Sequence, residues 1–156
     1  MGPEEILSVL EGNARRIAAV SAGLDGAVLQ AAPGMGEWSA AEVLAHLRAC
    51  GDMWGGAIER IVAEDRPSFR AVNPGTWIAK TDYPALEFSA LFSGYERQRR
   101  ELLALLRSLP AEDWERSGTV SVAGKPLERS VRFYGDWLAR HERPHVRQIE
   151  RAVSRE

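Results

Sequence analysis

Three histidines are the residues of this chain whose types and spacing best suit chemistry. His141 and His145 are four residues apart, and His46 lies in a separate helical pattern. Residues i and i+4 share one face of a helix, so His141 and His145 are expected to point the same way. Two imidazoles from one helix and a third from a neighbouring helix make a three-nitrogen metal site with open coordination positions. The spacing therefore predicts a reactive metal centre held by His46, His141 and His145.

An alternative interpretation makes the same residues part of the core. His141 and His145 fall near the middle of an apolar stripe, and a buried imidazole needs partners for both of its nitrogens. A shared divalent cation would satisfy both rings at about 2.0–2.1 Å. In the alternative, the two histidines are bonded to polar side chains such as Asn13, Tyr95 or Gln98.

Other polar residues near the histidines are weaker candidates for a metal-binding or catalytic role. Cys50 follows His46 by one helical turn and could approach a metal, although a lone cysteine is more often a small buried hydrophobe. Glu42 precedes His46 by one turn, but it completes the capping-box pattern that begins at Ser39. Asn13 and Tyr95 could orient a ligand or stay in the core. The sequence identifies no general base.

Helical periodicity predicts the elements that must position these residues. Apolar residues recur at helical spacing in four segments, over about 3–24, 39–64, 84–109 and from 127–130 to 153. Leu24 and Leu127 are expected on inward stripes, and Arg97, Arg99, Arg100 and Arg107 on an outward face. Thr81 or Asp82 is expected to cap the third helix. Four amphipathic helices predict an all-α, single-domain four-helix bundle over residues 1–156.

The connections between the predicted helices, and one proline within the last helix, modify the simple four-helix bundle. Residues 66–82 form a long irregular connection, which leaves room for a crossover and for a functional loop. Pro110–Trp114 is expected as one helical turn, residues 119–122 as a short extended piece, and residues 124–126 as a turn. Pro144 lies between two of the histidines, and a kink of the last helix is expected there.

Composition excludes several classes of function. The chain has 156 residues and a formal net charge of −2, which gives no general attraction to nucleic acid. The single cysteine cannot form an internal disulfide, which favours a reducing compartment. The start of the sequence has no apolar signal core, and no apolar run approaches the length of a membrane span. We therefore expect a cytoplasmic protein with neither nucleic-acid nor membrane partners.

Two segments of the chain resemble the DinB-like superfamily, a group of metalloenzymes named after a DNA-damage-inducible protein. One is Trp38-Ser-Ala-Ala-Glu-Val-Leu-Ala-His-Leu47. The other is Trp137-Leu-Ala-Arg-His141 together with His145-Val-Arg-Gln-Ile149. Between them, residues 97–114 resemble the third helix of that family and its exit. The resemblance covers nearly the whole chain and implies a four-helix bundle.

The resemblance also implies a metal site and a range of reactions. It assigns the three metal ligands to His46, His141 and His145, with zinc, nickel, iron or manganese as the ion. It further implies a homodimer and, in some branches, thiol-dependent transferases or isomerases that use bacillithiol, mycothiol or glutathione. Pro144 departs from the polar residue usual between the last two ligands.

These observations lead to two hypotheses. The first is a divalent-metal-dependent enzyme that acts on a small-molecule substrate, either as a hydrolase or as a thiol-dependent S-transferase with a low-molecular-weight thiol. Three neutral imidazoles leave the charge of the cation intact, which suits Lewis-acid chemistry. The second is a non-catalytic helical bundle that binds a metal or a small ligand, at a site that some of the five tryptophans could line.

Overall fold

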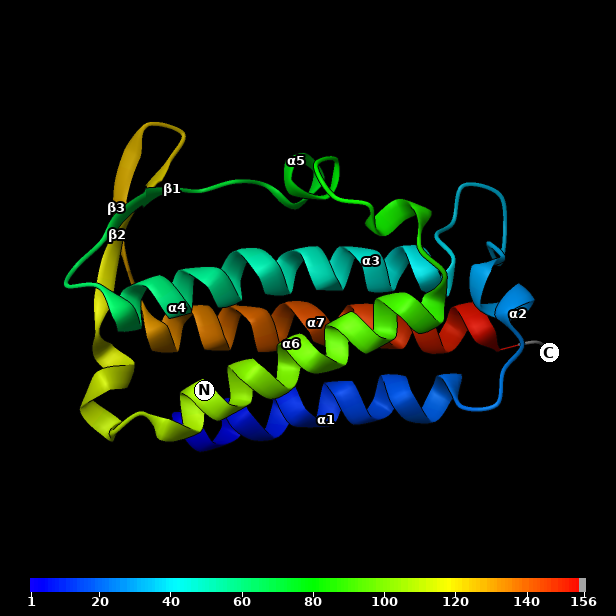
Figure 1. The fold of residues 1–156 in the computed structure, drawn as a ribbon, viewed down its shortest axis with the longest axis horizontal. Coiled ribbons are helices and arrows are strands. Elements are labelled where there is room, and N and C mark those ends of the chain that lie inside the picture. The colour runs from blue at the N-terminus through cyan, green and yellow to red at the C-terminus, as the bar shows by residue number, and fades with distance from the viewer. Residues whose placement is uncertain (155–156) are drawn as a thin grey trace.

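Four long helical segments form the body of the protein, as the sequence predicts. The computed structural model describes residues 1–154. The segments are α1 (Pro3–Ser21); the continuous run of α3 (Ala40–Cys50), a π-helical turn (Gly51–Gly55) and α4 (Gly56–Ala63); α6 (Phe88–Ser108); and α7 (Val131–Val153). Figure 1 shows them packed lengthwise against one another. The predicted all-α four-helix bundle is confirmed.

The long connection between α4 and α6 decides the order of the helices. In Figure 1, residues 64–87 return along the outside of the bundle from the end of α4 to the start of α6. As a result α3, α4 and α6 run in one direction, whereas α1 and α7 run in the other. The crossover for which the sequence left room is therefore present. α7 packs against both α1 and α3, so it lies next to the helix that carries His46.

Side chains at the helix starts explain where two of these helices begin. Ser39 Oγ accepts a hydrogen bond from the Glu42 amide, and a Glu42 carboxylate oxygen accepts one from the Ser39 amide, both at 3.1 Å. This pair is the predicted capping box, and it orients the helix of His46. Ser130 Oγ accepts from the Phe133 amide at 3.0 Å and caps α7.

Three expectations about helix boundaries are wrong. α1 ends at Ser21, so Leu24 lies outside it and is exposed; the short helix α2 (Gly26–Gln30) follows. α6 begins at Phe88 and its N-cap residue, Glu87, makes no side-chain cap. Thr81 and Asp82 instead precede a separate 3₁₀ turn (Tyr83–Ala85). Propensity predicts helix existence better than helix ends, because the ends depend on tertiary contacts.

A small sheet closes one end of the bundle. β1 (Ser68–Arg70) pairs parallel with β2 (Ser117–Val122), and β2 pairs antiparallel with β3 (Lys125–Ser130). Ala123 and Gly124 form the two-residue turn between β2 and β3, both with positive φ as tight hairpin turns require. The extended piece expected at 119–122 is thus part of a hairpin. Leu127 belongs to β3 and not to the last helix, where the sequence had placed it.

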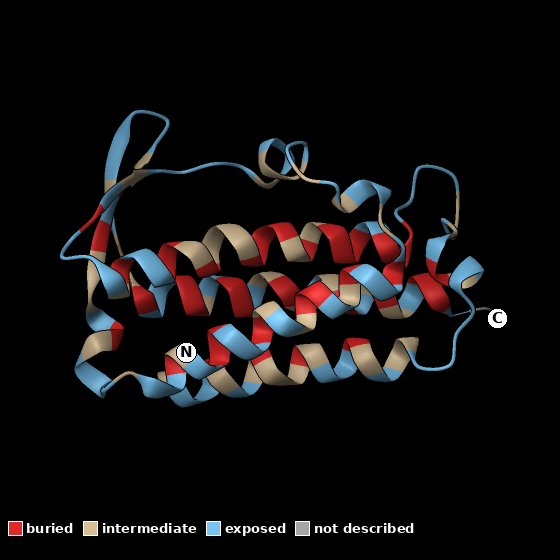
Figure 2. Cartoon of the chain, viewed as in Figure 1, coloured by how far each residue is buried: buried red, intermediate tan, exposed pale blue. Residues whose placement is uncertain are grey.

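The core runs along the inner faces of all four segments, and Figure 2 shows it as a band of buried residues on α3 and α7. One predicted outward residue is inside: Arg99 on α6 is 2 % exposed. The buried face of α7 also contains Glu142, whereas His141 and His145 flank that face and are half-buried. The histidines are therefore at the edge of the core and not in the middle of its apolar stripe.

The remaining elements cover the ends and one side. α5 (Pro74–Ile78) lies in the long connection, over α3, and a 3₁₀ turn (Ala111–Glu115) supplies the helical turn expected after α6. Within residues 1–154, no helix combines the length and the apolar character needed to span a membrane.

Candidate metal centre

α3 and α7 bring three ligand atoms together from distant parts of the chain. His46 Nε2 lies 3.1 Å from His141 Nε2. Cys50 Sγ, one turn beyond His46, lies 3.6 Å from both of these nitrogens. All three atoms fall within 4.8 Å of one another, and all belong to residue types that bind transition metals.

The spacing of these atoms fits the coordination of a divalent ion. In a tetrahedral zinc site, metal–ligand bonds of about 2.05 Å to nitrogen and 2.3 Å to sulfur put two nitrogens about 3.3 Å apart and a nitrogen and a sulfur about 3.6 Å apart. The separations in this protein are 3.1 Å and 3.6 Å. His46, His141 and Cys50 therefore lie at distances that one metal ion can span.

His145 completes a triangle of imidazole rings. Its ring centroid lies 4.7 Å from that of His46 and 4.8 Å from that of His141, and the His46 and His141 centroids are 5.3 Å apart. Imidazoles around one tetrahedral ion have centroids about 5 Å apart by the same bond geometry. The three rings therefore lie side by side, whereas the cluster of ligand atoms within 4.8 Å of one another among the described residues consists of His46, Cys50 and His141 and does not include a His145 nitrogen.

Gln148 gives the His145 ring a defined orientation. Its side-chain oxygen lies 2.9 Å from His145 Nδ1. A histidine that binds a metal through Nε2 usually donates its other N–H to an oxygen of this kind, which fixes the tautomer and the ring plane. Sequence reasoning did not single out Gln148, although its i+3 spacing from His145 is the available signal.

The surroundings keep two of the imidazoles neutral, which is the form that binds metals. Burial lowers the pKa of His46 to about 4, and the neighbouring His145 and His141 rings contribute further. Burial and His145 also lower the pKa of His141, although Glu142 opposes that change. Both rings therefore present a free nitrogen lone pair at neutral pH.

Cys50 is closer to the histidines than the sequence suggests. Its side chain is fully buried, and burial, together with Glu142 and Asp52, raises the pKa of the thiol to about 12 in the metal-free protein. The residue lies at the last turn of α3, directly before the π-helical turn Gly51–Gly55. Single π turns within helices are frequent at functional sites.

None of the partners expected for core histidines contacts a histidine. Asn13 Nδ2 and the Tyr95 hydroxyl both donate to the Glu142 carboxylate, at 3.1 Å and 3.3 Å. Gln98 donates to the Arg48 carbonyl and to Asp52. The core-histidine alternative therefore loses the hydrogen bonds on which it depended.

Glu142 was missed by the sequence reasoning, although it stands in a recognisable pattern. Residues 141–145 read His-Glu-x-x-His, which in many zinc proteases supplies two ligands and a glutamate base. Here the Glu142 carboxylate is fully buried and points away from the cluster of histidines, to Arg99 on α6. Arg99 Nη1 donates to it at 2.9 Å. Glu142 therefore fixes α7 in the bundle and is not placed to act as a base.

α7 continues through Pro144 without interruption. The helical assignment runs from Val131 to Val153 with Pro144 inside it. His141 and His145 thus keep the one-turn spacing that puts them on the same face.

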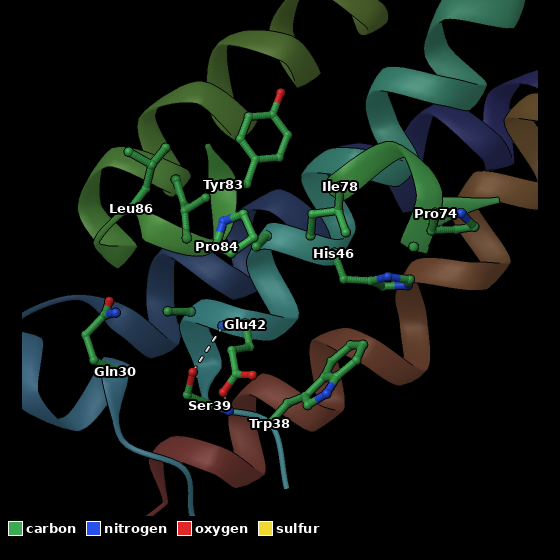
Figure 3. Close-up of a pocket in the computed structure, with 14 residues that line it drawn as sticks. Gln30, Trp38, Ser39, Glu42, His46, Pro74, Ile78, Tyr83, Pro84 and Leu86 are labelled. Atoms are coloured by element: carbon green, nitrogen blue, oxygen red, sulfur yellow. Dashed lines mark hydrogen bonds between the residues drawn. The ribbon is translucent and has the colours of Figure 1, made fainter. Parts of the chain in front are cut away.

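A cavity of about 670 Å³ opens beside His46. Figure 3 shows it between α3 and the crossing connection, with Pro74 and Ile78 of α5 near the His46 ring. Glu42 also lines this cavity, one turn before His46, while still holding the Ser39 amide. The size suits a small organic molecule, and the connection 66–82 contributes one wall through Pro74, Gly75 and Ile78.

Comparisons with known proteins agree with this architecture. No curated protein matches the chain significantly. Among solved structures, YfiT from Bacillus subtilis, described as a probable metal-dependent hydrolase with an unusual four-helix bundle topology, superposes with a TM-score of 0.78. It is 16% identical, and the match covers 96% of this chain and 85% of that one. At this identity the likeness shows the fold alone.

A family model gives the more direct assignment. The model of the DinB superfamily matches residues 10–149, a span that includes all three histidines, the whole of α3 and most of α7. The chain therefore belongs to the DinB superfamily.

Proposed function

We propose that this protein is a metal-dependent hydrolase whose divalent ion is held by His46, His141 and His145. The observation that carries the proposal is the approach of His46 Nε2 to His141 Nε2, with the His145 ring packed against both rings and His46 lining a cavity large enough for a small substrate. A divalent ion held by neutral ligands supplies Lewis acidity, which activates water and polarises a carbonyl oxygen.

The chain's own residues would hold this centre in place. Gln148 accepts from His145 Nδ1 and leaves its Nε2 for the ion. The buried contact of Arg99 with Glu142 sets the position of α7, and the Ser39 capping box sets the start of α3. Trp54 packs edge-on against the His141 ring, with centroids 4.9 Å apart, and limits its rotation.

The open side of the centre is the cavity beside His46. A catalytic metal site keeps a coordination position free for water or substrate, whereas a structural site is closed by protein ligands. The cavity reaches His46 from the side of α5, so a substrate bound there would approach the ion from that side. Small-molecule substrates are consistent with its volume.

The test is elemental analysis of protein purified without a metal-affinity tag, with His46→Ala, His141→Ala and His145→Ala in parallel. We expect about one divalent ion per wild-type chain and loss of the ion in each variant. Hydrolysis of a panel of small esters and amides would then depend on the added ion. A wild-type chain that binds no zinc, nickel, iron or manganese would contradict the proposal. The Phe133→Ala variant, which removes an exposed aromatic residue on the same face of α7, is a control for general damage.

A second candidate is a thiol-dependent transferase, which one observation favours. A separate cavity of about 540 Å³ adjoins His145 and is lined by Trp38, Gln148 and Arg151, among others. Two cavities that meet the histidines from different sides would suit two substrates, with Arg151 able to pair with a carboxylate of a small thiol. Arg151→Ala should then weaken the dependence of the rate on thiol concentration and leave simple hydrolysis unchanged. A rate that never depends on added thiol would reject this candidate.

A further inference from the structure

The cavity beside His46 is mainly apolar. Its walls include Trp38, Ile78, Pro84, Leu86 and Leu91, which come from the start of α3, α5, the following 3₁₀ turn and α6. In Figure 3 the labelled side chains of Trp38, Ile78, Pro84 and Leu86 surround a space that begins at His46 and extends toward Gln30. A ligand that fills such a space gains affinity mostly by burying apolar surface.

The outer wall of this cavity is fixed by hydrogen bonds. Asp52 lies behind the wall, in the π-helical turn, and its carboxylate accepts from Trp77 Nε1 at 3.0 Å and from the Tyr83 hydroxyl at 2.6 Å. The Arg48 guanidinium packs over the Tyr83 ring, 4.2 Å from its centroid. Both anchored aromatic residues flank the part of the wall that contains Ile78. The cavity is therefore a built site and not a gap under a loose loop.

The charge of the cavity is negative. Glu42, an exposed residue at the rim, is the one charged residue among the described residues that line it; no lysine or arginine of residues 1–154 does so. One Glu42 oxygen accepts from the Ser39 amide, and the other has no protein donor within the described chain. Arg48 lines a neighbouring pocket, together with Asp52, Glu59 and Glu101. An anion in the cavity would face Glu42 without a counter-charge on the wall, a repulsion that solvent screens because Glu42 is exposed.

Glu42 and His46 stand one helical turn apart on the same face of α3. The rise of four residues is about 6 Å. A group that reacts near His46 and a donor that meets Glu42 would therefore lie about one turn apart on the same ligand.

From these observations we propose that the cavity binds a small apolar molecule that carries an amine, whose N–H groups donate to Glu42, and that it rejects anions. This ligand is the substrate if the proposed hydrolase function holds, and its role as substrate rests on that function. Glu42 thus determines specificity, while the apolar wall supplies most of the affinity.

The experiment compares hexylamine, hexanol and hexanoate by isothermal titration calorimetry on the full chain after chelator treatment, with circular dichroism to verify folding. We expect hexylamine to bind most tightly and hexanoate to bind about fivefold more weakly than hexylamine, because the exposed Glu42 contributes a screened charge. In Glu42→Gln, which preserves the capping box, the ratio of the affinities for hexylamine and hexanol should fall to about twofold or less. Glu87→Gln removes an exposed charge beside Leu86, outside the cavity lining, and should leave the ranking unchanged.

A bulky substitution tests the location independently. Ile78→Trp should weaken all three ligands, because the new side chain occupies the cavity near His46. Hexanoate binding as tightly as hexylamine in the wild type, or a ranking unaffected by Glu42→Gln, would overturn the inference. Repeating the series with zinc added separates the two proposals. Amine binding without metal uptake would reject the hydrolase and keep the amine-binding cavity. Metal uptake without a preference for the amine would reject the amine-binding cavity and keep the metal centre.

Discussion

Arg99 on α6 and Glu142 on α7 form an ion pair in the interior, with side chains that are 2 % and 0 % exposed. Arg99 Nη1 also donates to the Leu10 carbonyl of α1 at 3.0 Å, so the pair joins three helices. Tyr95 and Asn13 supply the remaining donors to Glu142. Because Glu142 is the neighbour of His141, this network sets the position of the helix that carries two of the proposed ligands.

Removing one member of this pair should strongly destabilise the protein. Glu142→Ala leaves the Arg99 guanidinium buried without its counter-ion, and we expect the free energy of unfolding to fall by about 3–5 kcal/mol. Urea unfolding monitored by circular dichroism measures this change. The double variant Arg99→Met with Glu142→Leu removes both charges and should recover much of the loss. A double variant no more stable than Glu142→Ala would contradict the ion-pair explanation.

His145 and Cys50 should differ in their importance for metal binding. We expect His145→Ala to weaken zinc binding more than about 100-fold, because second-sphere changes alone already cost about 10–100-fold. Cys50→Ser should change it by less than about tenfold, since three imidazoles suffice for the proposed centre. Competition with a chelating dye measures both affinities.

The absorption spectrum of the cobalt-loaded protein can contradict the assignment of His145 as the third ligand. Cobalt-loaded wild-type protein should lack the absorption of a thiolate–cobalt bond. A strong thiolate band that disappears in Cys50→Ser, together with retained binding in His145→Ala, would make Cys50 the third ligand. Cys50 Sγ lies 3.6 Å from both His46 Nε2 and His141 Nε2, which is close enough for Cys50 to be the third ligand.

The stability of the metal-free protein should fall as the pH is lowered from about 6.5 toward 4. The pKa of His46 is about 4 in the folded protein, because burial and the rings of His145 and His141 disfavour its charged form, and its ordinary value is 6.5. Between these values the unfolded chain binds more protons than the folded one, so acid favours unfolding. Urea unfolding at several pH values measures the slope. His46→Gln should make it shallower, and equal slopes in the two proteins would contradict the prediction.

Asp52 should control the wall of the cavity. Asp52→Ala removes the acceptor of Trp77 Nε1 and of the Tyr83 hydroxyl, and each lost bond to a charged group is worth about 1.5–3 kcal/mol. We expect faster proteolysis within residues 71–86 and weaker ligand binding in the cavity. Asp82→Ala is the matched control, because Asp82 is an exposed neighbour of Tyr83 that makes no side-chain cap. Equal cleavage rates in both variants would count against the anchoring role.

The sequence by itself determined the features that depend on neighbours along the chain. Helical periodicity indicated the four long segments, and the Ser39–Glu42 pattern identified the start of α3, because both arise within a few residues. The i,i+4 spacing placed His141 and His145 on one face for the same reason. The helical pattern around His46 made it the expected third ligand, and resemblance to a family assigned the same three residues.

Only the tertiary structure decided which side chains meet across the bundle. An arginine on a helix normally faces water, and Arg99 is inside because Glu142, 43 residues away, neutralises it there. Cys50 reaches the histidines because α3 and α7 pack closely at that level, and the sequence contains no local signal of this packing. The cavity exists because residues 64–87 cross back over α3. These contacts join residues far apart in the chain, and burial, charge pairing and chain path together determine them.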